Sequence, residues 1–384
     1  MQLRSLVVTT LAAFLSACGT GCGSSEVNPT NDDNMLEAEC SETDRCSVGY
    51  ACVSGQCVVD DGDGDASGSD PSDTDGSDPA PGDDTTGGDT GGDPVTPPPP
   101  QHLRFVAIGD TGKGNDTQKN VANSIAAVCA VEGCDFMLLL GDNIYPSGVS
   151  SVDDPQWQEK FELPYSVLDF PIWGVLGNHD YGGDGLGNEE WKGQIQVDYA
   201  AISPKLEMKG AFYTFTAKNV GFVVLDTNSI LYDKGGPQRD WFPGAMQSLQ
   251  TEWKIVLGHH PYRSNGKHGN AGNYDDVPPY GALEVPAGVH VKEFMDDVVC
   301  GTNDVYLSGH DHSLQWLKET LCGAELVVSG GGASFTAIEG HGNQAFWENA
   351  EAGFFYVDIV GKTFKGRFYA EDGTLRYERT FTKP

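Results

Sequence analysis

Apolar runs that end at a glycine and a polar motif recur along the later part of the chain. LRFVAI, FMLLL, PIWGVL, KIVL and DVYLS precede GDTG (109–112), GDNIY (141–145), GNHD (177–180), GHHP (258–261) and GHDH (309–312). Short continuous apolar runs are typical of parallel strands buried on both faces. Since ligands in open α/β sheets bind beyond the carboxyl ends of the strands, the five motifs are expected to meet.

Helical periodicity and further strand-like runs fill the segments between these motifs. Val121, Ile125 and Val128 recur at helical spacing before Gly133, which predicts a helix and its end inside a β-α-β unit. The sequence Glu-Asp-Gly at 371–373 is typical of a β-hairpin turn. We therefore expect an α/β fold with two facing sheets and outer helices. Further helices are predicted at 157–168, 244–252 and 290–300, and strands at 212–215, 221–226, 325–330, 354–361, 364–370 and 375–381.

The first part of the chain lacks this pattern. Residues 1–18 contain an apolar stretch and small residues, as in a secretion signal. The sequence Leu-Ser-Ala-Cys ending at Cys18 resembles the lipobox of bacterial lipoproteins, whose cysteine is lipidated; an ordinary signal peptide with a chance cysteine is the alternative. Residues 19–39 are expected to be a polar spacer. Residues 58–101 are a linker of Asp, Gly, Ser, Thr and Pro that is too polar to form a core, and the globular domain is expected to span residues 102–384.

Ten cysteines fit an oxidising compartment. Four of them fall within residues 40–57, where the gaps are wider than in zinc sites and no histidine is near. A small disulfide-rich module of undetermined pairing is expected there. The large domain offers two further candidate pairs, Cys129 with Cys134 and Cys300 with Cys322.

Charge restricts the partners. The chain of 384 residues has a formal net charge of −33, and residues 60–93 contain 12 aspartates without lysine or arginine. So acidic a protein is not expected to bind nucleic acid or an anionic membrane surface through charge. Membrane contact is expected through lipidated Cys18, and the protein is expected to be a monomer.

The five motifs supply carboxylate, amide and imidazole groups, which are ligands for hard and borderline metals. Asp142 stands centrally among them and is placed to bridge two metals. Two metals about 3.5–4 Å apart clamp the attacking and leaving oxygens of phosphoryl transfer. His179 and His268, the latter in KHG (267–269), remain for protonating a leaving alkoxide. A lone Asp or His at a strand end is usually a hydrogen-bonded loop residue, but five such ends in this order favour a metal site.

The order of the motifs resembles the metallophosphoesterase superfamily. The tyrosine in GDNIY is typical of its purple acid phosphatases, and GHHP followed by KHG resembles the short, tartrate-resistant acid phosphatase-like branch. The resemblance covers about residues 103–335. It implies a four-layer αββα sandwich of two facing mixed sheets flanked by helices.

The same resemblance implies a binuclear centre of Fe(III) and a second divalent metal, Fe, Zn or Mn. His179 and His268 match the family's two histidines that orient the phosphate and assist the leaving group. A tyrosine phenolate is a hard anionic donor suited to a ferric ion, and its charge transfer would colour the protein. The ligand sets implied are Asp110, Asp142, Tyr145 and His312 for iron, and Asp142, Asn178, His259 and His310 for the second metal.

Some residues depart from the family pattern. Thr111 stands where the animal enzymes usually carry a large aromatic residue, and Lys113 is either a phosphate-attracting or a solvated lysine. Residues 270–286 are a polar, Pro-rich insertion that is expected at the rim of the site or as a lid. These differences leave the substrate open.

The sequence therefore predicts an exported phosphomonoesterase, an acid phosphatase anchored at Cys18 in the bacterial cell envelope. A hydroxide activated by the metals would attack phosphate esters in line. A phosphodiesterase or nucleotide hydrolase on the same centre is one alternative. The other is a surface interaction protein whose cysteine-rich module binds a partner.

Overall fold

The computed structural model describes residues 50–53, 56–59 and 101–384. The chain divides into two compact units, residues 1–91 and 92–384. In the first unit, β1 (Tyr50–Val53) and β2 (Gln56–Val59) form an antiparallel hairpin with Cys52 opposite Cys57. The expected signal sequence with Cys18, the spacer, most of the cysteine-rich module and nearly all of the linker lie outside the described residues.

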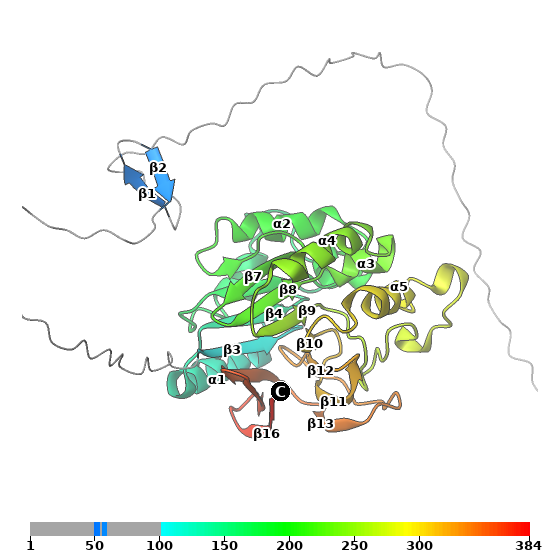
Figure 1. The fold of residues 1–384 in the computed structure, drawn as a ribbon. Helices are drawn as coiled ribbons and strands as arrows, with labels where there is room; N and C mark the ends of the chain where they lie inside the picture. Colours follow the sequence, from blue (N-terminus) through cyan, green and yellow to red (C-terminus); the bar gives the residue numbers. More distant parts are fainter. Residues whose placement is uncertain (1–49, 54–55, 60–100) are drawn as a thin grey trace, which may run out of the picture. The chain divides into compact units, whose positions relative to one another are not determined.

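Two mixed sheets of seven strands each build the second unit (Figure 1). The first sheet has the order β16-β15-β14-β3-β4-β5-β6, and the second has the order β13-β11-β12-β10-β9-β8-β7. Strands β3 to β6 run parallel, as do β8, β9, β10 and β12, and antiparallel strands complete each sheet. This arrangement places the ends of the parallel strands along one edge of each sheet.

The strands of the first sheet are β3 (His102–Ile108), β4 (Phe136–Leu140), β5 (Ile172–Val175), β6 (Leu206–Glu207), β14 (Gly353–Val360), β15 (Thr363–Ala370) and β16 (Leu375–Thr382). Those of the second are β7 (Tyr213–Ala217), β8 (Val220–Val224), β9 (Trp253–Leu257), β10 (Val305–Ser308), β11 (Leu314–Leu321), β12 (Ala324–Ser329) and β13 (Ala345–Asn349).

The core between the sheets is aromatic. Phe105 of β3 and Phe136 of β4 meet Phe222 of β8 edge to face, at centroid distances of 5.5 and 5.6 Å. All three side chains are nearly or completely buried. Edge-to-face pairs add about 0.5–1.5 kcal/mol each beyond the burial of their area, so the facing sheets form a firm base for the loops at their edges.

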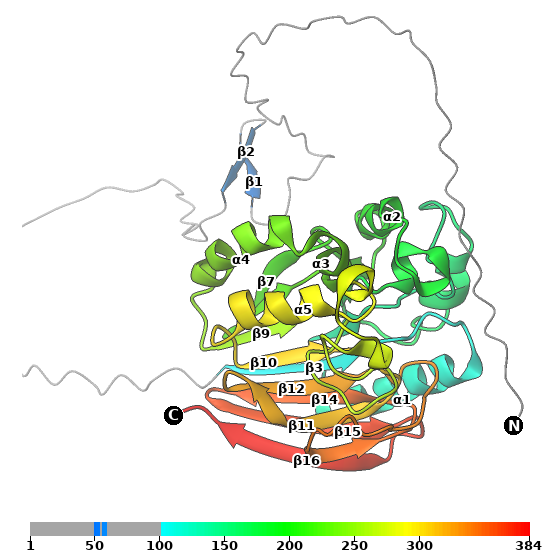
Figure 2. The same cartoon turned by 90° about the vertical axis from the view of Figure 1, so that its right-hand side faces the viewer.

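Helices cover the outer faces. A second apolar cluster joins the second sheet to α3 (Thr227–Asp233), α4 (Gly236–Ser248) and α5 (Val289–Phe294), which gather on one side of the sheets in Figure 2. The first sheet is covered by α1 (Asp116–Glu132) and α2 (Trp191–Ala200). The predicted four-layer α/β sandwich is thus confirmed. None of the described helices combines the length and apolar composition needed to cross a bilayer.

Most predicted strands are confirmed within one or two residues, and α1 ends at Gly133 as predicted. The helix predicted at 290–300 is confirmed as α5, which continues as a π-helix at Met295–Val299. Two other helix predictions were inaccurate. Residues 157–168 hold only a π-helical turn, Gln158–Glu162. The helix predicted at 244–252 is α4, which begins earlier because a proline fits its first turn, where no N–H donor is needed. The elements α2, α3, β6, β11 and β13 were not predicted.

Both candidate disulfides of the large domain are present. Cys129 in α1 is bonded to Cys134, which closes the loop before β4. Cys300, after the π-helix, is bonded to Cys322 in the turn between β11 and β12. The two bonds tie helix ends to strand connections on the periphery of the domain.

Candidate metal centre

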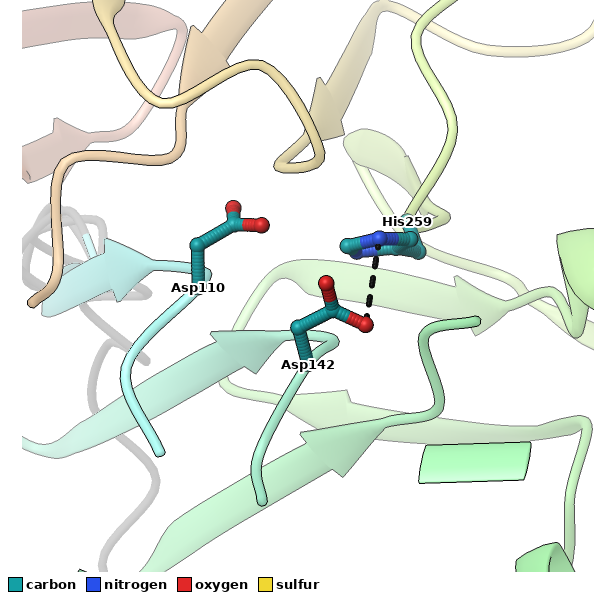
Figure 3. A group of neighbouring side chains, drawn as sticks. All are labelled: Asp110, Asp142 and His259. Atoms are coloured by element: carbon teal, nitrogen blue, oxygen red, sulfur yellow. Dashed lines mark ion pairs between the residues drawn. The ribbon is translucent and has the colours of Figure 1, made fainter. Parts of the chain in front are cut away.

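The loops after β3, β4 and β5 of the first sheet meet the loops after β9 and β10 of the second. Asp110, Asp142 and His259 offer ligand atoms that all lie within 4.8 Å of one another. Figure 3 shows these side chains pointing toward a common space from three strand ends. All three are almost completely buried. The convergence expected from the strand-end motifs is therefore present.

The backbone at these positions is held in an uncommon conformation. Asp110, Asp142 and His310 have φ angles of 61°, 55° and 68°, in the left-handed region. Non-glycine residues there cost free energy and persist where the surroundings impose them, which is frequent at functional sites. Gly141 precedes Asp142 with a φ of 91°. A Cβ on Gly177 would lie 2.3 Å from the backbone nitrogen of Asp142, so this glycine leaves room for the carboxylate.

One group of donors surrounds the hydroxyl of Tyr145. This oxygen lies 3.1 Å from Oδ1 of Asp110, 2.8 Å from Oδ2 of Asp142 and 3.0 Å from Nε2 of His312. A phenol has one proton and cannot donate to three neighbours. The arrangement suits a cation that takes the place of the proton and is shared by the four side chains.

A second group surrounds Nε2 of His259. The Nδ1–H of this ring donates to the carbonyl of Leu140 at 2.8 Å, because a carbonyl only accepts. A neutral His259 therefore presents the lone pair of Nε2 to Oδ1 of Asn178 at 2.9 Å and to Asp142 at 3.4 Å. The amide of Asn178 cannot be turned over, because its Nδ2 donates to the carbonyl of Gly185 at 2.8 Å. Acceptors that face one another in this way need a proton or a metal ion between them.

Asp142 belongs to both groups and could bridge two ions. Burial alone would raise the pKa of its carboxyl, but the charge of His259 and the hydrogen bond to it hold this pKa below its usual range. For His259 the opposite holds: burial alone would lower the pKa, and the charge and hydrogen bond of Asp142 raise it to about 9. In the absence of a metal, this pair holds a proton where a metal ion would bind.

His310 completes the second group. Its Nδ1 lies 3.1 Å from Nε2 of His259, and its backbone N–H donates to Oδ2 of Asp110 at 2.8 Å. Burial and the neighbouring histidines His268, His260 and His259 lower its pKa well below the usual value, so the ring is neutral. A neutral imidazole is the form that binds a metal.

The two remaining histidines lie on either side of the same space. The Nδ1–H of His179 donates to the carbonyl of Pro146 at 2.6 Å. The backbone N–H of His179 donates to Oδ1 of Asp142 at 2.9 Å. The ring of His268 packs against that of His310 with a centroid distance of 4.2 Å and an interplanar angle of 31°. The structure thus brings all nine candidate site residues into one connected cluster.

A cavity of about 310 Å³ opens onto this cluster. Its lining includes Asp142, His179, His268 and Lys267. Lys267 therefore brings a positive charge to the cavity wall. The cavity is the place where a phosphate group would reach both groups of donors.

Two residues that support the cluster, Asp180 and Asp311, escaped prediction. The carboxylate of Asp180 accepts from the backbone N–H groups of Asn143, Ile144 and Gly177, which fixes the GDNIY loop. The carboxylate of Asp311 accepts from the N–H of His268 at 2.7 Å and so holds the KHG loop. Both lie inside the motifs GNHD and GHDH, where only the neighbouring residues had been assigned roles.

Lys113 is neither freely solvated nor directed at the cavity. Its Nζ donates to Oγ of Ser334 at 2.7 Å, and Ser334 is 3.0 Å from Nδ1 of His312. The amine also lies 4.8 Å from the centre of the Tyr145 ring. Burial lowers the pKa of Lys113, although Asp110 and Asp142 oppose this effect. Lys113 therefore helps to position the donors around Tyr145.

Comparison with known proteins identifies the family to which this arrangement belongs. Residues 103–314 match the calcineurin-like phosphoesterases. The chain belongs to this family. Tartrate-resistant acid phosphatase type 5 of Sus scrofa is 30% identical over 312 residues, which are 71% of this chain and 84% of that protein. Purple acid phosphatase 3 of Arabidopsis thaliana is 28% identical over 276 residues, 66% of this chain and 69% of that protein. Within the family, the chain is thus a purple acid phosphatase relative, as its motifs had suggested.

A solved structure shares the fold. GAP50, described as the anchor in the inner membrane complex of Plasmodium, superposes with a TM-score of 0.58 and 19% identity, over 73% of this chain and 89% of that one. At this identity the likeness concerns the fold alone. The function must be argued from the side chains of the centre.

Proposed function

We propose that the protein is an exported, lipid-anchored phosphomonoesterase with a binuclear Fe(III)–M(II) centre, where M is Fe, Zn or Mn. The observation that carries this proposal is the pair of donor groups joined by Asp142, each of which needs a cation. Relatives named purple acid phosphatase and tartrate-resistant acid phosphatase support hydrolysis of phosphoric monoesters.

The donor set fits two ions. Asp110, Asp142, Tyr145 and His312 would hold the ferric ion, since two carboxylates and a phenolate are hard anionic ligands. Asp142, Asn178, His259 and His310 would hold the divalent ion through more neutral donors. When bound, the two metals would supply a nucleophilic hydroxide and neutralise charge on the phosphoryl oxygens.

The chain's own residues bind and orient the ester. Lys267 lines the cavity and would attract the phosphate dianion. The Nδ1–H of His179 is committed to the carbonyl of Pro146, so Nε2 is the ring atom left for the phosphate. In the protonated ring this Nε2–H would donate to a phosphate oxygen and orient the ester. These contacts would place the phosphorus in line between the nucleophile and the leaving oxygen.

His268 is the better candidate for the proton donor. Its Nδ1 lies 3.0 Å from Oδ1 of Asp275, and a carboxylate partner favours the protonated ring. Burial opposes this effect, but the bond to Asp275 and the charge of Asp311 raise the pKa of His268 above its usual value. His268 would give its Nε2 proton to the departing alkoxide.

Export is supported by the two disulfides of the large domain, which are typical of oxidising compartments. The secretion signal and the lipobox-like sequence that ends at Cys18 add the proposed route and anchor. The acidic linker would separate the enzyme from the membrane of the bacterial envelope.

The function is tested with Asp142→Ala in metal-replete full-length protein. Loss of the carboxylate common to both groups should remove both metals and abolish hydrolysis of phenyl phosphate, while Asp153→Ala, an exposed-loop control, should retain both. Hydrolysis by Asp142→Ala at the wild-type rate would contradict the proposal. Rates on diphenyl phosphate, the corresponding diester, are measured in parallel. A higher rate on the diester than on phenyl phosphate would indicate a phosphodiesterase instead of a phosphomonoesterase.

A further inference from the structure

A second cavity, of about 400 Å³, lies directly beside the metal cavity. The two share Asn178, Gly185, His268 and His310 as wall residues. Its volume falls within the range of about 300–1,000 Å³ that is typical of small-molecule sites. A phosphate ester bound in the metal cavity would therefore extend its alcohol portion into this second space.

Three separate segments build the outer wall of the second cavity. The loop after the GNHD motif contributes Leu186, α3 contributes Leu231 and Tyr232, and the insertion at 270–286 contributes Val285 and Pro286 among others. The insertion is thus part of the active-site wall. The rim position expected for it from sequence corresponds to one side of this cavity.

Hydrogen bonds hold these segments in place. The hydroxyl of Tyr232 donates to the carbonyl of Leu186, and Nδ2 of Asn228 donates to the carbonyl of Gly187 at 2.9 Å. Across the base of the insertion, the N–H of Tyr274 donates to the carbonyl of Ala287 at 3.1 Å. The wall is consequently formed before a ligand binds, which reduces the entropy that binding must overcome.

The wall of the second cavity combines a large apolar surface with little charge. Leu186, Leu231, Tyr232, Val285 and Pro286 make much of it apolar, and neither lysine nor arginine lines it. Its one carboxylate, Asp275, is engaged by His268. Apart from His268, which the proposed function commits to the departing alkoxide, a leaving group that carries a further phosphate would meet no cation here and would lie near this carboxylate. An apolar leaving group would instead exclude water from the wall.

We propose that this cavity binds the leaving group and selects monoesters of uncharged, apolar alcohols, including aryl-bearing ones, over bisphosphates and nucleotides. This inference rests on the proposed phosphomonoesterase function and adds the substrate class. It also names Leu186, Tyr232 and Val285 as residues that determine specificity.

The test compares 2-phenylethyl phosphate with propane-1,3-diyl bisphosphate, which both release a primary alcohol. Metal-replete full-length protein is assayed as wild type, as Leu186→Lys and as Leu283→Lys. Leu186 is 68% exposed, so a lysine at this position is tolerated by the fold. Leu283 lies in the insertion at 270–286, is 40% exposed and is not part of the cavity wall, which makes it the control.

We expect wild type to favour the phenylethyl ester in kcat/KM by about tenfold or more, the usual effect of a hydrophobic pocket. Leu186→Lys should reduce this preference by about tenfold, whereas Leu283→Lys should leave it unchanged. Equal or better hydrolysis of the bisphosphate by wild type, or a Leu186→Lys preference equal to that of wild type, would overturn the inference. Hydrolysis of neither ester would instead refute the proposed function itself.

Discussion

Nδ1 of His268 lies 3.0 Å from Oδ1 of Asp275, and the two residues come from a family motif and from the insertion that follows it. Asp275 adopts the left-handed conformation with a φ of 52°, and its N–H donates to the carbonyl of His268 at 3.0 Å. The pair therefore joins the insertion to the centre by both a side-chain and a backbone contact. Asp275 acts as a positioning residue for His268.

The first prediction concerns this pair. General acid catalysis contributes about 10²–10⁴-fold, so His268→Ala should slow hydrolysis of alkyl phosphates by that order. It should slow 4-nitrophenyl phosphate far less, because nitrophenolate leaves without a proton. Asp275→Asn should show a smaller loss with the same dependence on the leaving group. Its exposed neighbour provides the control, since Asp276→Asn should keep wild-type rates on both esters. Equal losses on both classes of ester would exclude the role of proton donor.

Gly177 leads to a second prediction. An added Cβ at this position would lie 2.3 Å from both the backbone nitrogen and Oδ1 of Asp142. Gly177→Ala should therefore displace the bridging carboxylate and lower metal content and activity together. Gly244→Ala, in α4 with nothing near the added Cβ, is the matched control and should retain both. Full metal content in Gly177→Ala would show that Asp142 tolerates the displacement.

The metal-free protein should show a characteristic dependence of stability on pH. The pKa of His259 is raised from an ordinary 6.5 to about 9, so its protonation stabilises the fold fully below pH 6.5 and this contribution is lost as pH rises through about 9. The pKa of Asp142 is lowered instead, so its contribution is present above its ordinary 3.8 and is lost as pH falls. Between pH 3.8 and pH 6.5 the charged forms of Asp142 and His259 both stabilise the fold.

The measurement is the thermal midpoint of chelator-treated protein between pH 6.5 and 9. Wild type should lose more stability over this window than His259→Gln, which has no proton to lose. Added metal should flatten the wild-type dependence, because a metal ion would then replace the proton. Identical curves for wild type and His259→Gln would show that this proton does not stabilise the metal-free fold.

The anchor is tested by Cys18→Ser. A lipidated cysteine would keep the wild-type protein with the membrane fraction, and the variant should appear in the soluble fraction. Acyl chains bind membranes through about 0.8 kcal/mol per buried CH₂, so removal of the acylation site should have a large effect. If Cys18→Ser still sediments with membranes, the lipobox interpretation is wrong.

The sequence predicted the centre better than its surroundings. Asp110, Asp142 and His259 each follow an apolar strand at once, and the geometry of parallel sheets brings such positions together. Asp275 could not be assigned in this way, because its contact with His268 depends on a local turn in a segment without periodicity. The strand β11 was missed because the charged residues Lys318 and Glu319 in its second half interrupt the apolar run.

The position and lining of the cavities could not be predicted from the sequence either. The apolar wall combines residues from three loops and helices that are distant in the chain, including Leu186, Tyr232 and Val285. No single segment carries its pattern, whereas each metal-site motif is complete within four or five residues. The substrate class proposed above therefore rests on the assembled structure rather than on the motifs.

The central claim is that Tyr145 and Asp142 hold a ferric ion in a two-metal centre, and the visible spectrum of protein purified without chelator tests it most directly. The metal content is measured on the same sample, and Tyr145→Phe serves as the control. We expect a broad charge-transfer band in the visible region and about two metals per chain including iron, with the band absent from Tyr145→Phe. Two metals without colour in wild type would contradict the ferric assignment to Tyr145, and folded protein unable to bind metal would contradict the centre as a whole.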